Sequence, residues 1–174
     1  FMLDNFNDII SFMQSISEKA TYVKNIVIDD STYIMRKEYF KTAKQTGYNK
    51  FIDMASHFQS IINTAENMRD NINVFLIMHS EDIVSDNVIV GYKPSTVGKL
   101  IDNSYNPIEV VPMLLYSAVK YDENKNPIYG FYTHRCLDGN IEIPAKSPAE
   151  MFDKDFIPND LGLVVKAMDE YYNG

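Results

Sequence analysis

The stretch Val23-Lys24-Asn25-Ile26-Val27-Ile28-Asp29-Asp30 joins a short apolar run to two adjacent carboxylates. Such a run is typical of a strand buried within a parallel sheet. Open α/β sheets bind their ligands outside the carboxyl ends of their strands. The stretch therefore predicts a parallel sheet with Asp29 and Asp30 at its ligand-binding edge.

The same two acids match the Walker B pattern of nucleotide hydrolases, in which the first acid holds Mg²⁺ and the second polarises water. The glycine-rich loop G-x-x-x-x-G-K-[ST], which wraps the phosphates in such sites, does not occur in the 174 residues. We therefore expect an N-terminally truncated chain, and its start at Phe1 favours the same expectation. A simpler alternative stays open, in which Asp30 or Ser31 caps the next helix.

The composition bounds the class of protein. A chain of 174 residues with 45% hydrophobic and 23% charged residues predicts one globular domain over residues 1–174. Its one cysteine, Cys136, excludes an internal disulfide and favours a reducing cytoplasm. Neither a signal peptide nor a run of 18 apolar residues is present, so we expect no contact with a membrane. The net charge of −8 argues against coating by nucleic acid through bulk electrostatics.

Hydrophobic periodicity predicts the order of elements in the first half of the chain. A helix with one apolar face begins at Asp4 or Asn5 and ends near Lys19. After Asp30, helical periodicity over residues 33–46 and 50–69 precedes a second apolar strand over residues 73–78. A strand, helices and a strand in this order make a crossover unit of a parallel sheet.

The second half is predicted to contain shorter elements. Residues 111–121 and 127–135 form strands of a hairpin around a polar turn. Ser147-Pro148 opens a brief helix that ends at Phe152, and Asn159 or Asp160 caps a final helix. Further predicted elements are a loop that begins at Glu81 and Asp82, a strand at Val88–Tyr92 and a helical turn at Ser95–Ile101.

His79-Ser80 follows the second predicted strand. If the two strands are neighbours, these side chains lie beside Asp29 at one edge of the sheet. A polar group there can sense a γ-phosphate or orient the attacking water. The alternative is a loop histidine that bonds only to the backbone.

The segment Gly91–Leu100 resembles a phosphate loop only superficially. Six residues separate its glycines where the phosphate loop has four, and Leu100 stands where a hydroxyl must reach Mg²⁺. Lys99 can still contact a phosphate or a partner. Together with Lys93, Arg135 and Lys146 it is a candidate for a local basic patch that binds nucleic acid, although scattered solvated side chains explain the same residues.

Arg135 and Lys146 are also candidates for a cation that reaches the γ-phosphate of ATP in an adjacent subunit. Surface salt bridges are the alternative for both. The alternating aromatics of residues 129–135 fit a half-buried strand, and they also fit stacking on single-stranded bases.

Several motifs in a fixed order resemble the phage-encoded RecA-like P-loop ATPases of single-strand annealing and recombination. The resemblance covers nearly the whole chain from Asn25 onward. Its motifs are Ile26–Met35, Gly47–Phe51, Phe75–Glu81, Thr96–Asp102, Asp138-Gly139, Ala145–Pro148 and Asn159–Leu161.

This resemblance implies an α/β, three-layer RecA-like P-loop NTPase core with a mostly parallel sheet and a C-terminal antiparallel hairpin. By position, Asp29 looks like the Mg²⁺ ligand, Asp30 the neighbouring acid, and His79 with Ser80 the sensor. Arg135 and Lys146 are similar in placement to the cations at the intersubunit nucleotide site. The implied cofactors are ATP and Mg²⁺.

The implied partners are single-stranded DNA, further copies of the chain in a head-to-tail ring or filament, and a phage single-strand-binding protein or exonuclease. The expected place of action is the bacterial host cytoplasm. A different hypothesis remains open, that of a non-catalytic DNA-binding or assembly module that lacks the phosphate loop.

Overall fold

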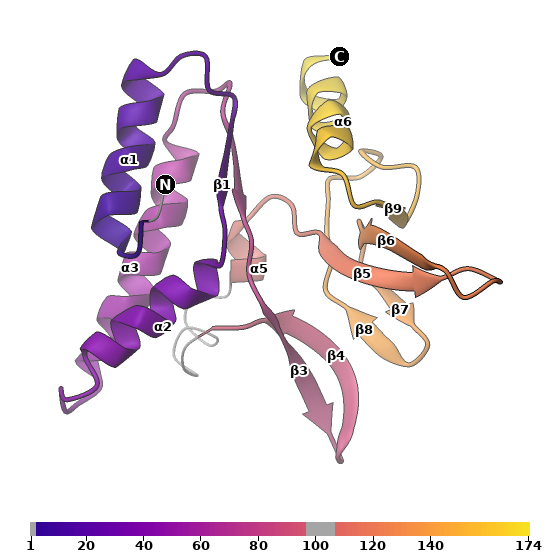
Figure 1. Ribbon diagram of the computed structural model, residues 1–174, viewed down its shortest axis with the longest axis horizontal. Helices are drawn as coiled ribbons and strands as arrows, with labels where there is room; N and C mark the ends of the chain where they lie inside the picture. Colours follow the sequence, from indigo (N-terminus) through magenta and orange to yellow (C-terminus); the bar gives the residue numbers. More distant parts are fainter. Residues whose placement is uncertain (1–2, 97–106) are drawn as a thin grey trace. The chain divides into compact units, whose positions relative to one another are not determined.

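The computed structural model describes residues 3–96 and 107–174, and the chain divides into two compact units (Figure 1). The first comprises Phe1–Ser80 and Pro94–Pro107, and the second comprises Glu81–Lys93 and Ile108–Gly174.

The first unit is built around two parallel strands. Its elements are α1 (Phe6–Lys19), β1 (Asn25–Ile28), α2 (Ser31–Lys41), α3 (Asn49–Glu66) and β2 (Asn73–Leu76). β1 and β2 pair in parallel, with Asn25 opposite Asn73 and Ile28 opposite Leu76. The predicted crossover of strand, helices and strand is therefore confirmed.

The helices of this unit follow the predicted signals with small shifts. Asn5 caps α1, since its side-chain oxygen accepts a hydrogen bond from the Asp8 N–H at 3.0 Å. α2 ends at Lys41, five residues before the predicted end, and the chain then turns through Gly47 at a φ of 99°. That left-handed conformation favours glycine and separates α2 from α3.

One face of the β1–β2 pair is buried under the helices. Ile26 and Ile28 point into a core with side chains of α1, α2 and α3. Val27, on the opposite face, is 50% exposed. The predicted burial of this strand is therefore correct for one face only. The buried members of this core are Ile9, Met13, Ile26, Ile28, Ile34, Ile61 and Met68.

The second unit contains two small sheets and a helix. β3 (Ser80–Ser85), β4 (Val88–Pro94), β8 (Ile141–Ile143) and β7 (Cys136–Asp138) form one sheet in that order. β5 (Tyr116–Tyr121), β6 (Pro127–Tyr132) and β9 (Phe156–Pro158) form the other, which is antiparallel throughout. α6 (Leu161–Asn173) follows β9, and the short α5 (Pro107–Val110) precedes β5.

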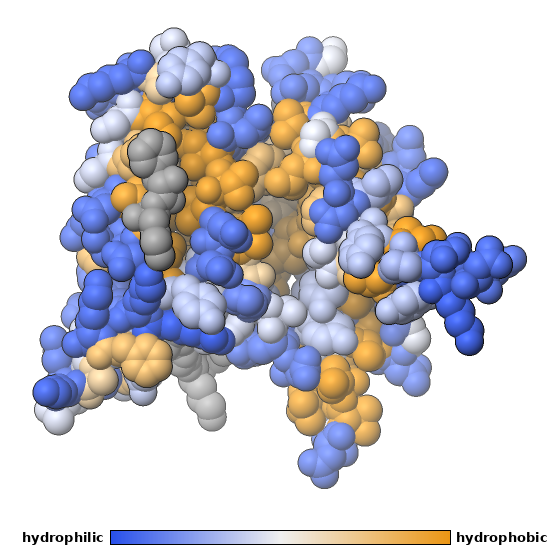
Figure 2. Space-filling view, in the orientation of Figure 1, coloured by the Kyte–Doolittle hydropathy of each residue, from blue (hydrophilic) through white to orange (hydrophobic). Residues whose placement is uncertain are grey.

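β3 and β4 form a hairpin that exposes aliphatic side chains. Its two-residue turn uses Asp86 and Asn87, both with positive φ, which suits the right-handed twist of the strands. The space-filling view shows apolar surface over this hairpin (Figure 2). Its exposed aliphatic residues are Ile83, Val84, Val88, Ile89 and Val90.

The expected three-layer RecA-like core is wrong. The described strands form separate sheets of two, four and three strands, and antiparallel pairs dominate after β2. Apolar runs predict where strands occur but not which strands pair, and short turns make local antiparallel pairing available. The chain is a mixed α/β protein with small sheets.

Two local predictions are also wrong, and three are confirmed, among them the strand predicted at Val88–Tyr92, which is β4. Glu81 and Asp82 lie in β3 rather than in a loop, and the segment after Ser147 forms a turn instead of a helix. The predicted hairpin is present as β5–β6. Asp160 caps α6 by accepting a 2.7 Å hydrogen bond from the Gly162 N–H. Within residues 3–96 and 107–174, none of the helices combines the length and the apolar composition that a membrane span requires.

Candidate functional site

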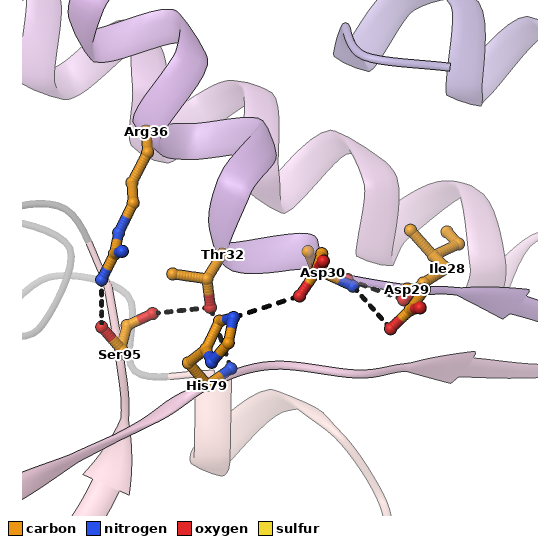
Figure 3. Close-up of polar contacts among 8 residues, drawn as sticks. Ile28, Asp29, Asp30, Thr32, Arg36, His79 and Ser95 are labelled. Atoms are coloured by element: carbon orange, nitrogen blue, oxygen red, sulfur yellow. Dashed lines mark hydrogen bonds and ion pairs between the residues drawn. The ribbon is translucent and has the colours of Figure 1, made fainter. Parts of the chain in front are cut away.

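The parallel pairing of β1 and β2 brings two polar segments to one edge. Beyond the strands, the Ile77 N–H donates to the Ile28 carbonyl and the Ser31 N–H donates to the Ile77 carbonyl, each at 2.9 Å. These bonds hold the residues that follow β1 beside those that follow β2. Asp30 Oδ1 lies 3.1 Å from His79 Nε2 as a result (Figure 3).

Asp30 adopts an unusual backbone conformation at this edge. Its φ of 51° and ψ of 40° are left-handed, a state that costs a non-glycine residue about 1–2 kcal/mol. It occupies the N-cap position of α2, but its side chain makes no capping hydrogen bond. The capping alternative therefore does not describe the carboxylate of Asp30, which faces His79 instead.

Ser31 does not cap α2 in the usual way either. Its hydroxyl donates to the Ile28 carbonyl at 3.0 Å, which ties the first turn of the helix back to the end of β1. Asp29 Oδ1 accepts a 2.9 Å hydrogen bond from the Asp30 N–H. Both carboxylates are thus positioned by the tight connection between β1 and α2.

Thr32 fixes the other side of the edge. Its side chain is fully buried, and its hydroxyl accepts from the His79 N–H and donates to the Ser95 carbonyl, each at 3.2 Å (Figure 3). The Ser95 N–H donates in turn to the His79 carbonyl at 2.7 Å. Three segments far apart in the sequence are therefore joined at residues 32, 79 and 95.

A cation that the sequence analysis did not single out lies near this network. Arg36 is one turn after Thr32 on α2, and its guanidinium contacts the Ser95 hydroxyl at 3.4 Å. It also lies 5.6 Å from the centre of the Tyr33 ring, which meets the His79 ring edge-on at 5.8 Å. No pattern in the sequence singles out Arg36, because its partner Ser95 is 59 residues away along the chain.

The cluster is open to solvent and acidic. The side chains of His79 and Asp30 are 52% and 60% exposed, so the attraction between them is largely screened by water. We use the name "acidic edge" for Asp29, Asp30 and His79 together. The chemistry available to the acidic edge is coordination by carboxylate oxygens and proton exchange at an accessible imidazole.

The acidic edge fits one common way of binding Mg²⁺. Among residues 3–96 and 107–174, no three His, Cys, Asp or Glu side chains are grouped to hold a metal ion. Magnesium in phosphoryl-transfer sites is usually bound by one or two carboxylates, with waters and substrate phosphates as the remaining ligands. Asp29 and Asp30 match that limited protein contribution.

The other predicted site residues are not part of the acidic edge. Ser80 is an exposed residue at the start of β3, and Lys93 on β4 forms a 2.9 Å ion pair with Glu81. Arg135 and Lys146 belong to the second unit. Lys99 lies outside the described residues.

The two cations of the second unit have different surroundings. Arg135 is 72% exposed and forms a 2.7 Å ion pair with Glu142, which raises the pKa of the guanidinium. Lys146 is half-buried, and its backbone pairs with Leu114 through two 2.8 Å hydrogen bonds. The surface salt bridge weighed as an alternative for Arg135 is therefore present.

No family model matches the chain, and comparison with curated proteins and with solved structures found no similar protein.

Proposed function

We propose that the acidic edge is the Mg²⁺-binding part of an ATP site, in a phage recombination protein that couples ATP hydrolysis to binding or annealing of single-stranded DNA. The single observation that carries the proposal is the contact of 3.1 Å between Asp30 and His79 at the shared carboxyl edge of two parallel strands. The ordered motifs that resemble phage recombination ATPases add to it.

Each residue of the acidic edge has a distinct role in this proposal. Asp29 holds Mg²⁺, which neutralises charge on the phosphate oxygens when it is bound. Asp30 orients a water molecule, and His79 contacts the terminal phosphate. The left-handed backbone of Asp30 supports a functional role, because strained conformations concentrate at functional sites.

Other groups must complete the site. A loop that surrounds the phosphates is required for tight nucleotide binding, and none of the 174 residues supplies its motif. In the proposal, this loop comes from outside these residues, and Arg135 and Lys146 reach the nucleotide of an adjacent copy in a head-to-tail ring or filament. Lys93 and Lys99 contact single-stranded DNA, and a phage single-strand-binding protein or exonuclease is a further partner.

The test is phosphate release from ATP by the assembled protein, with and without Mg²⁺ and single-stranded DNA. Asp29→Asn is expected to lower kcat by at least about 100-fold, since it removes the charge that holds the metal. Asp53→Asn is the matched control, because Asp53 is an exposed acid on α3 and is not part of the acidic edge. Equal Mg²⁺-dependent rates for Asp29→Asn and the unaltered protein would refute the proposal.

A second candidate is a non-catalytic module that binds single-stranded DNA or assembles with partners. The absence of a phosphate-loop motif from the sequence favours it. Such a module binds single strands without nucleotide, and its affinity falls steeply with salt. Binding that depends on ATP and is lost in Asp29→Asn would favour the ATPase.

A further inference from the structure

The second unit places a serine, a histidine and an aspartate in a row. Ser147 Oγ lies 3.2 Å from His134 Nε2, and Asp155 Oδ1 lies 3.6 Å from His134 Nδ1. His134 follows β6, Ser147 follows the backbone pairing of Lys146 with Leu114, and Asp155 precedes β9. Catalytic serines are recognised by a histidine within hydrogen-bond reach and by the group that orients that histidine, whatever their order in the chain.

The hydrogen bonds around His134 determine which ring nitrogen carries the proton. The Thr133 hydroxyl donates its one proton to the Lys154 carbonyl at 2.7 Å. Its 2.9 Å contact with His134 Nδ1 must therefore be one in which the hydroxyl accepts from an N–H. In the neutral ring, Nε2 is then the acceptor, and the Ser147 hydroxyl donates to it.

The same segments are held in place by backbone contacts. Thr133 is fully buried, and its N–H donates to the Asp155 carbonyl at 2.9 Å. The two hydrogen bonds between Lys146 and Leu114 fix the residue before Ser147. Nucleophile and base thus stand on anchored positions, which productive geometry requires.

The pair is also accessible to a reactant. The His134 side chain is 33% exposed, and Ser147 is half-buried. Asp155 is 77% exposed and beyond hydrogen-bond distance from the ring, so it acts on an imidazolium through its charge. The buried Thr133 hydroxyl, rather than Asp155, is the group that orients the imidazole.

We propose that Ser147 is a nucleophile activated by His134, and that it accepts acyl groups from small activated esters. Ser147 Oγ attacks the ester carbonyl carbon while its proton passes to His134 Nε2. The bond to the leaving alcohol breaks, and the imidazolium returns the proton to that alcohol. Water then hydrolyses the acyl-serine through the same base, which releases the carboxylic acid and restores the hydroxyl.

The first test uses p-nitrophenyl acetate and a fluorophosphonate probe on the 174-residue chain. The expected result is a burst of p-nitrophenol of about one equivalent and a single adduct that maps to Ser147 by mass spectrometry. Ser147→Ala is expected to abolish both, and a burst that persists in this variant would refute the proposal, since acetylation of an imidazole would then explain it.

Three further variants separate activation from simple exposure. His134→Gln is expected to slow labelling of Ser147 by about 100-fold or more, the usual contribution of a general base. Thr133→Val is expected to slow it as well, because the imidazole loses the group that fixes its tautomer. Ser117→Ala is the control, since Ser117 is an exposed serine whose hydroxyl accepts from the Asn159 amide rather than bonding to a histidine.

Folding of each variant is checked by circular dichroism before labelling. Unchanged labelling in Ser117→Ala together with slow labelling in His134→Gln supports the proposal. Equal labelling rates in His134→Gln and the unaltered chain, with the fold retained, would show that Ser147 is not activated by its neighbour.

Discussion

Replacing Thr32 by valine removes one hydroxyl from the network that joins α2 to the segments at residues 79 and 95. The side chain is fully buried, and valine preserves its shape. The hydroxyl makes two hydrogen bonds at 3.2 Å, and its loss leaves the Ser95 carbonyl without this partner in a residue that is 4% exposed. A buried group that loses its partner costs about 1–3 kcal/mol.

The His79 N–H loses a partner as well, in a residue whose side chain is 52% exposed. We therefore expect Thr32→Val to lower the free energy of unfolding by about 2 kcal/mol. With a urea dependence of about 2 kcal/mol per molar, the midpoint falls by about 1 M. Urea titration followed by far-UV circular dichroism measures the shift, since α1, α2 and α3 all belong to this unit.

Thr64→Val is the matched control. The Thr64 hydroxyl donates at 2.7 Å to the Ser60 carbonyl within α3, a local bond that adds little to helix stability. Its midpoint is expected to stay within about 0.2 M of the unaltered chain. Equal midpoints for Thr32→Val and Thr64→Val would refute the reasoning that Thr32 holds the acidic edge together.

Three further predictions concern packing and charge. Phe58→Ala is expected to lower the free energy of unfolding by about 3–5 kcal/mol, because Phe58 is 2% exposed. Ile52→Ala on the same helix should lower it by about 1 kcal/mol or less, because Ile52 is 49% exposed. Thermal unfolding of both variants measures the difference. Gly130→Ala should destabilise the second unit by about 1–3 kcal/mol or more. The added carbon would stand 2.3 Å from an aromatic ring of β9 and 2.6 Å from a backbone oxygen. Faster hydrogen exchange along β6 would reveal this destabilisation. Hydrogen bonds from Asn126 lower the pKa of Asp122 below 3.8. The ionised Asp122 therefore contributes to stability above that pH, and this contribution is lost as the pH falls through the folded-state pKa. Urea titrations of Asp122→Asn and of the unaltered chain should differ at pH 7 and converge at low pH.

The sequence was sufficient to predict the elements that local chemistry determines. Asn5 and Asp160 begin helices because their side chains satisfy free N–H groups, and each is one of the two cap residues predicted for its helix. The β1–β2 pair was predictable because two apolar runs were separated by helical periodicity. That pairing predicted His79 beside Asp29, whereas the carboxylate that His79 contacts is that of Asp30.

Partners of short strands could not be predicted in the same way. β7, β8 and β9 have three residues each, too few for a hydrophobic period to be visible. Their pairing depends on contacts distant in sequence, such as Gly91 opposite Glu142. The three-layer core failed for this reason, since it assumed that later strands extend the first sheet.

The polar networks were also invisible in the sequence. Nothing local to Thr32 indicates that its hydroxyl bonds to Ser95, 63 residues away. The contact between Ser147 and His134 likewise depends on where two loops end. Such side-chain networks arise from tertiary placement, so only the structure reveals them.

The central claim is that the acidic edge binds a divalent cation together with phosphate. The most direct measurement is NMR of the chain with substoichiometric Mn²⁺ and ATP, because Mn²⁺ prefers the same oxygen ligands as Mg²⁺ and broadens nearby signals. We predict selective broadening at Asp29, Asp30 and His79, with Asp53 unaffected, and loss of the effect in Asp29→Asn. Equal broadening at Asp53 and at the acidic edge, or broadening that persists in Asp29→Asn, would contradict the account.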